Sequence, residues 1–177
     1  MEIKDLLQDR REVILKKWFD VLLQTYPEET SRFLRKEKDP FSNPVGSAIT
    51  EGISGIYQSI LDGVDIKEVS PFLDRIIRIR AVQDFTPSQA LGFLFLLKGV
   101  IRDVLLKEIS KRGLDEELHT IESRIDDIAL IAFDIYMQCR EKLYDLRATE
   151  LRNMTYRLLE RANLTKDLGN GQEGVSD

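Results

Sequence analysis

The chain has 177 residues, of which 42% are hydrophobic and 32% charged, and its formal net charge is −5. A chain of this length fits one domain with a sizeable core, and the composition is that of an ordinary soluble protein. The acidic balance argues against a nucleic-acid binder and an electrostatic membrane anchor, and the single cysteine excludes an internal disulfide framework.

We expect neither a secretory signal peptide nor a membrane span in this sequence. The first five residues lack the apolar region of a signal peptide. Lys98, Arg102 and Asp103 interrupt the most apolar segment too often for a membrane span. We therefore expect a cytoplasmic protein.

The first elements in chain order are two amphipathic helices. Apolar residues at helical spacing predict a first helix over residues 3–24, which Tyr26 and Pro27 end. A short second helix is expected over residues 28–35, with Phe33 and Leu34 as its apolar anchors. Residues 36–44 then form a charged loop that contains two prolines.

Two further helices are predicted before residue 84. Asn43 followed by Pro44 is typical of a helix start, and Gly63 ends that helix. Three glycines lie beside its isoleucine seam and would allow close backbone approach: Gly46, Gly52 and Gly55. Ser70 and Pro71 predict the start of the next helix, which runs to about Gln83.

The segment from Arg80 to Arg112 is the one around which the fold is organised. Thr86, Pro87 and Gln89 predict a capped helix start, and Gly113 predicts its end. Apolar residues fall on every side of this helix, so we expect it to be buried all round. The other helices should wrap around it.

The last predicted helix runs from Leu114 to about Asn163. Its apolar residues alternate four and three apart, which is the coiled-coil seam pattern. They are Leu114, Leu118, Ile121, Ile125, Ile128, Ala132, Ile135 and Cys139. We expect an all-α multi-helix bundle over residues 1–163, and a disordered tail over residues 164–177.

No catalytic or metal-binding constellation is evident in the sequence. His119 is the single histidine and is expected on the surface, so neither haem nor zinc has a ligand set. Cys139 continues the apolar seam as a small hydrophobe, with a redox-sensing thiol as the alternative. Asp126 and Asp127 are adjacent helix positions that point in different directions, which favours solvated charge over acid–base catalysis. We therefore expect no enzyme activity, no cofactor and no metal.

One polar group remains a candidate anion, ligand or partner site. Arg80, Gln83 and Asp84 precede the start of the central helix, and Asn43 precedes the start of another. A helix N-terminus with a nearby arginine can hold a small anion. Alternatively, Arg80 pairs with Asp84 while Gln83 satisfies loop backbone, and we favour this structural interpretation because buried helix starts need such partners.

Two segments resemble a known family. Asp39-Pro40-Phe41-Ser42-Asn43-Pro44-Val45-Gly46 and Arg80-Ala81-Val82-Gln83-Asp84-Phe85-Thr86-Pro87-Ser88-Gln89-Ala90 are similar to signatures of the RsbRD N-terminal domain. Such domains precede a STAS domain, as in bacterial stressosome co-antagonists, or a histidine-kinase module. The resemblance implies a sensory or regulatory input role without enzymatic activity, and globin-like, haem-free packing as in related stressosome input domains.

The expected function is that of an input module. No STAS sequence, kinase core or phosphoacceptor region follows the last helix, so we expect a stand-alone module that acts by contact with a partner protein. Two alternatives are a globin-like sensor that binds a small ligand and a structural adaptor of a larger complex.

The terminal helix is the expected site of homodimer formation. At about 50 residues it would be about 75 Å long, more than the roughly 30–40 Å expected across such a domain. Part of it must therefore project from the domain or fold back onto it. A projecting part would expose an apolar stripe that a second copy could bury. The stripe comprises Leu143, Leu146, Leu151, Met154 and Leu158.

Overall fold

The computed structural model describes residues 2–37 and 39–170, with side chains as far as Asn163. In this part of the chain every regular element is an α-helix, so the predicted all-α class is confirmed. The helices are α1 (Ile3–Asp9), α2 (Arg11–Leu23), α3 (Glu28–Lys36), α4 (Pro44–Asp62), α5 (Ile66–Val82), α6 (Pro87–Arg112) and α7 (Asp115–Asn170). None of these helices has the length and apolar character that crossing a bilayer requires.

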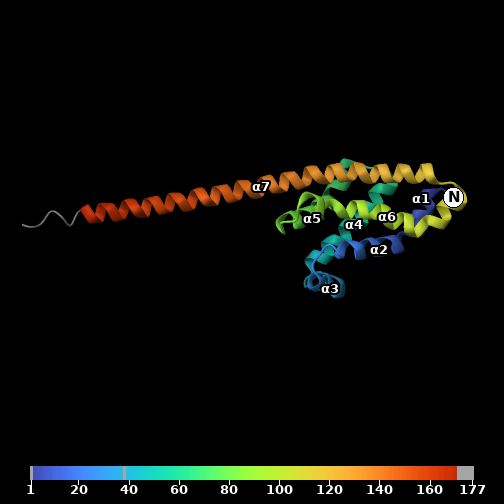
Figure 1. Cartoon of the computed structure of the whole chain (residues 1–177), viewed down its shortest axis with the longest axis horizontal. Helices are drawn as coiled ribbons and strands as arrows, with labels where there is room; N and C mark the ends of the chain where they lie inside the picture. Colours follow the sequence, from blue (N-terminus) through green and yellow to red (C-terminus); the bar gives the residue numbers. More distant parts are fainter. Residues whose placement is uncertain (1, 38, 171–177) are drawn as a thin grey trace, which may run out of the picture. The chain divides into compact units, whose positions relative to one another are not determined.

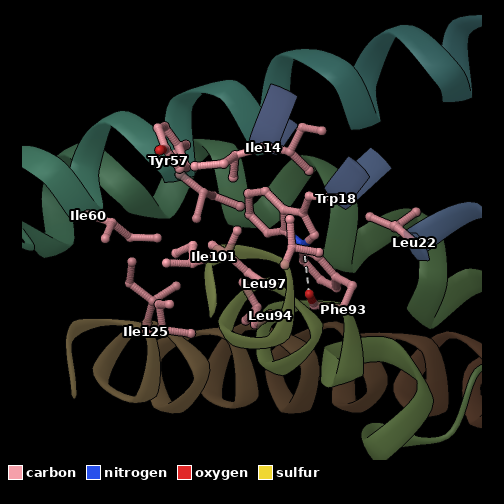
Figure 2. Packing of buried hydrophobic residues seen from close by; sticks show 14 of the residues in the cluster. Ile14, Trp18, Leu22, Tyr57, Ile60, Phe93, Leu94, Leu97, Ile101 and Ile125 are labelled. Carbon is pink, nitrogen blue, oxygen red and sulfur yellow. Dashed lines mark hydrogen bonds between the residues drawn. The ribbon is translucent and has the colours of Figure 1, made fainter. Parts of the chain in front are cut away.

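The chain divides into two units, Met1–Cys139 and Arg140–Asp177, and α7 contributes residues to both. Figure 1 shows the central position of α6 within the first unit. In Figure 2, side chains of α6 meet Ile14 and Trp18 of α2, Tyr57 of α4 and Ile125 of α7. The expected bundle around a central helix is thus confirmed.

The first predicted helix is in fact two helices, so that expectation is wrong. Arg10 separates α1 from α2 with backbone angles of φ −99° and ψ 8°, outside the α-helical range. The reason lies in the gap between the buried residues Leu7 and Ile14. No large apolar side chain between them packs into the core, and the chain bends there.

Helix α5 begins earlier than expected. The side chain of Asp65 accepts a hydrogen bond of 2.7 Å from the Lys67 amide and caps a helix that starts at Ile66. Val69 is buried and anchors this additional turn in the core. Pro71 therefore lies inside the helix rather than at its start.

The predicted ends of α6 are confirmed, but its complete burial is not. Thr86 and Gln89 form the capping box, Pro87 is the first helical residue, and Gly113 adopts the left-handed conformation at the end. Three large apolar side chains of the helix are nevertheless exposed to solvent. They are Phe95, Leu96 and Leu106. The core surrounds only part of the helix, which a sequence that is apolar on all sides cannot reveal.

Two glycines bring α4 and α5 close together, as predicted. A Cβ atom on Gly52 would lie 2.7 Å from Cδ1 of Ile76, and one on Gly55 would lie 2.3 Å from the Phe72 ring. Both distances are shorter than real carbon contacts. The helix pair is therefore packed at a separation that only glycine allows.

The apolar seam of α7 packs against the core as expected, with full burial from Leu114 to Ala132 and partial burial of Ile135 and Cys139. The helix continues to Asn170, past the expected end near Asn163, and the first helix-breaking residue of this stretch is Gly169. Residues 171–177 of the expected disordered tail lie outside the described residues.

Candidate functional site

The Arg80 side chain lies in the core rather than at the surface. It extends from the last turn of α5 and is fully buried. Its Nη1 donates to the Gln89 carbonyl oxygen at 2.8 Å, and its Nη2 donates to the Thr25 hydroxyl at 2.6 Å. Arg80 thereby ties three separate segments of the chain together.

Three aromatic rings surround the Arg80 guanidinium. The distances from its central carbon to the ring centroids are 5.0 Å for Tyr26, 4.8 Å for Phe85 and 5.4 Å for Phe93. Rings at such distances attract the cation through their negative faces. They compensate part of the cost of burying a charge.

The electrostatics of this cluster are those of a desolvated cation. Burial lowers the pKa of the Arg80 guanidinium from its ordinary value, and Tyr26 acts in the opposite direction. Among the described residues, Arg80 Nε and the Tyr26 hydroxyl are buried without a hydrogen-bond partner. Arg80 remains charged because an arginine does not lose its proton in a protein.

The residues predicted around Arg80 do not gather there. Gln83 and Asp84 are exposed, and the hydrogen bonds of Arg80 go to Thr25 and Gln89 rather than to Asp84. The backbone of Asp84 has a φ of +58°, which turns the chain between α5 and α6. The expected Arg80–Asp84 ion pair is therefore not what fixes this turn.

Asn43 belongs to a different part of the molecule. Its side-chain oxygen accepts from the Gly46 amide at 2.8 Å, as the predicted helix cap requires. Its nitrogen donates to the carbonyl oxygens of Leu34 at 3.1 Å and Glu37 at 2.8 Å. Asn43 thus fastens the loop between α3 and α4.

Sequence reasoning missed Thr25, Tyr26 and Phe93 as partners of Arg80. Thr25 stands 55 positions from Arg80 in the chain. A local pattern carries no signal for a contact between residues so far apart in sequence. The only local hint of an aromatic environment for Arg80 was Phe85, next to the start of the helix.

A second candidate site is an apolar groove between α6 and α7 in the first unit. It has a volume of about 490 Å³, and its lining is almost entirely apolar. Phe95 is 50% exposed, Leu130 69% and Phe133 45%. The lining residues are Pro87, Ser88, Leu91, Phe95, Asp126, Ala129, Leu130 and Phe133.

Ion pairs connect the same two helices beside this groove. Lys98 Nζ lies 2.6 Å from the carboxylate of Asp126, one of the lining residues. Arg102 donates to both carboxylate oxygens of the buried Glu122, at 2.6 and 2.8 Å. Both pairs connect α6 to α7, and the Lys98 pair balances the charge of Asp126.

The remaining candidate residues lie apart from both sites. His119 is exposed as expected, and Cys139 is half-buried. Asp127 is exposed, which agrees with its interpretation as a solvated surface charge. Across the described residues, no group of three or more His, Cys, Asp or Glu side chains is placed to hold a metal ion.

The second unit carries the apolar stripe expected on the terminal helix. Leu146, Leu151, Met154 and Leu158 are exposed, whereas Leu143 is half-buried. Tyr144, Tyr156 and Leu159 are additional exposed side chains that were not predicted.

Comparison with known proteins adds a family match. The family described as the RsbT co-antagonist protein rsbRD N-terminal domain matches residues 12–151. An uncharacterized protein of Archaeoglobus fulgidus is 27% identical over 143 residues, which are 80% of this chain and 84% of that protein. No solved structure matches the chain.

Proposed function

The chain belongs to the RsbT co-antagonist protein rsbRD N-terminal domain family, and on this premise we propose that it is a non-catalytic sensory or regulatory input module of stressosome-type signal transduction. It acts in the cytoplasm by contact with another protein, and α7 is the contacting element. The observation that carries this proposal is the family match over most of the chain.

The exposed residues of α7 support protein contact as the mode of action. Leu151, Met154 and Leu158 recur three and four apart on the helix and are exposed in the second unit. An isolated helix gains little stability from propensity and depends on packing. The proposal therefore includes a homodimer in which two copies bury the stripe of Leu143, Leu146, Leu151, Met154 and Leu158.

The test compares two variants of the full chain in cells of the source organism. One carries Leu151→Glu together with Met154→Glu, and the control carries Asn153→Glu, which adds charge to the same exposed turn. Crosslinking followed by mass spectrometry should recover a signalling partner with the native chain and the control. The double variant should lose it.

The second measurement is the molecular mass of the purified proteins by light scattering. The concentration is tens of micromolar, the range in which a seam of this size should pair. The native chain should have the mass of a dimer and the double variant that of a monomer. A native chain that is monomeric and crosslinks to no signalling protein would contradict the proposal.

A further inference from the structure

The cluster around Arg80 contains two polar atoms that the other side chains leave unsatisfied. Arg80 Nε and the Tyr26 hydroxyl are buried and have no hydrogen-bond partner among the described residues. Arg80 is fully buried, and Tyr26 is only 7% exposed. Buried polar groups in folded proteins are nearly always hydrogen-bonded, and the exceptions can mark a bound water molecule or ion. Two such atoms on neighbouring side chains therefore point to a bound species.

The charge of Arg80 is an independent observation. Its two hydrogen bonds go to the Gln89 carbonyl oxygen and the Thr25 hydroxyl, which are both uncharged. In the part of the chain that the structure describes, no carboxylate forms an ion pair with Arg80. A buried charge is costly unless an opposite charge or a full set of hydrogen bonds compensates it. The cluster thus carries one positive charge that an anion would neutralise.

The arrangement of donors suits an anion. The bonds to Gln89 and Thr25 occupy Nη1 and Nη2 and hold the guanidinium in place, so Nε is presented to the unsatisfied side. Burial lowers the pKa of Arg80, and Tyr26 opposes this shift, which places the Tyr26 hydroxyl close to the guanidinium. The arginine Nε–H only donates hydrogen bonds, and a tyrosine hydroxyl can donate one. Two donors can therefore act on one acceptor.

We propose that Arg80 Nε and the Tyr26 hydroxyl bind a small inorganic anion, of the size of a halide, in the core of the first unit. Larger anions such as phosphate esters or acidic peptides do not fit beside side chains that are so deeply buried. A water molecule could satisfy the same two atoms, but it would leave the charge of Arg80 uncompensated. The inference goes beyond the proposed function and does not depend on it.

Phe85 connects this site to α7. Its ring centroid lies 4.8 Å from the guanidinium carbon of Arg80, and its amide donates to the Arg80 carbonyl oxygen at 3.2 Å. The Phe85 carbonyl oxygen in turn accepts a hydrogen bond of 2.6 Å from the hydroxyl of Tyr136 on α7. A bound anion would therefore stabilise the turn to which this part of α7 is anchored.

The first test is urea denaturation of the full chain in sodium chloride and in sodium gluconate at equal ionic strength and fixed protein concentration. Screening is then the same in both salts, and gluconate is too large for the site. A ligand that binds only the folded chain stabilises it in proportion to the logarithm of its concentration once the site is nearly saturated. In that range, each tenfold rise in chloride should raise the folding equilibrium constant about tenfold.

The diagnostic variant is Tyr26→Phe, which keeps the ring beside Arg80 and removes one of the two donors. The matched control is Tyr57→Phe, because the Tyr57 hydroxyl is also buried but is already satisfied by the Leu7 carbonyl oxygen at 2.9 Å. The stability advantage of the native chain over Tyr26→Phe should grow with chloride concentration. Its advantage over Tyr57→Phe should be the same in both salts, since general salt effects act on both variants alike.

Crystals grown in sodium bromide provide the direct measurement. An anomalous bromide peak within hydrogen-bond distance of Arg80 Nε and the Tyr26 hydroxyl is expected in the native chain and should be absent from Tyr26→Phe. A bromide peak without chloride dependence in solution would mean an adventitious ion only and would overturn the inference. Water density without an anomalous signal, or equal chloride dependence in native chain and Tyr26→Phe, also overturns it. Each of these negative results leaves the proposed function unaffected, because that function is tested on the terminal part of α7.

Discussion

The guanidinium of Arg80 donates a hydrogen bond of 2.6 Å to the hydroxyl of Thr25, although the two residues stand 55 positions apart in the chain. This contact joins the end of α5 to the segment that follows α2. Together with the bond to the Gln89 carbonyl oxygen, it makes one buried side chain the link between α5, α6 and the segment that follows α2.

Arg80→Met should lower the free energy of unfolding by about 3 kcal/mol, because it removes the two part-buried hydrogen bonds from a charged donor to the Gln89 carbonyl and the Thr25 hydroxyl. Urea denaturation provides the measurement. The control is Arg78→Met, which breaks an exposed pair with Asp74 and should cost less than about 1 kcal/mol. Equal midpoints for the two variants would show that the buried cation does not stabilise the fold.

Alkaline pH should destabilise the protein through Tyr57. Burial raises the pKa of its hydroxyl above the ordinary value of 10.0, although the charge of Arg11 lowers it somewhat. The unfolded chain therefore loses this proton at a lower pH than the folded chain. The contribution to stability is complete below pH 10 and declines above it by up to about 1.4 kcal/mol per pH unit.

The matched variant for this prediction is Tyr57→Phe. It loses the 2.9 Å hydrogen bond to the Leu7 carbonyl oxygen and should be less stable by about 1 kcal/mol at neutral pH. Because phenylalanine does not titrate, the stability difference from the native chain should narrow between pH 9 and pH 11. A constant difference over this range would refute the assignment.

Two glycine-to-alanine substitutions should have opposite effects on thermal stability. At Gly55 the new methyl group would lie 2.3 Å from the Phe72 ring, and the forced shift should cost about 1–3 kcal/mol. At Gly99 nothing lies within 4 Å, so alanine should stabilise α6 by up to about 1 kcal/mol through helix propensity. Calorimetry at a concentration that keeps the oligomeric state constant tests the difference in sign.

The turn at Asp84 should be sensitive to the shape of its side chain. Its φ of +58° lies in the left-handed region, where aspartate and asparagine are tolerated but β-branched residues are not. Asp84→Val should therefore destabilise the protein by about 1–2 kcal/mol more than Asp84→Asn does. Similar unfolding midpoints for both variants would indicate that the backbone relaxes at this turn.

Local sequence signals predicted the helix ends well. Thr86, Pro87 and Gly113 bound α6, and Asn43 caps α4, because each of these roles depends on residues within one or two turns. The break at Arg10 was missed because it depends on which side chains of this segment pack into the core. That packing is decided by helices elsewhere in the chain.

The candidate site was predicted less well for the same reason. Arg80 was singled out from the sequence as part of a candidate site, but its partners Thr25 and Phe93 come from segments that no local pattern connects to it. The exposed face of α6 was also missed. A helix that is apolar on all sides looks buried in the sequence, and only the packing shows that Phe95 remains exposed.

The contact between Trp18 and Phe93 has a consequence for the order of folding. The indole nitrogen of Trp18 donates a hydrogen bond of 2.7 Å to the Phe93 carbonyl oxygen. The two residues stand 75 positions apart, so this contact closes a long loop of chain. The α4–α5 hairpin closes a much shorter loop, and loop closure costs more entropy as the loop lengthens. We expect the hairpin to form first and the pairing of α2 with α6 to complete the domain. The fluorescence of the single tryptophan should then follow that last step.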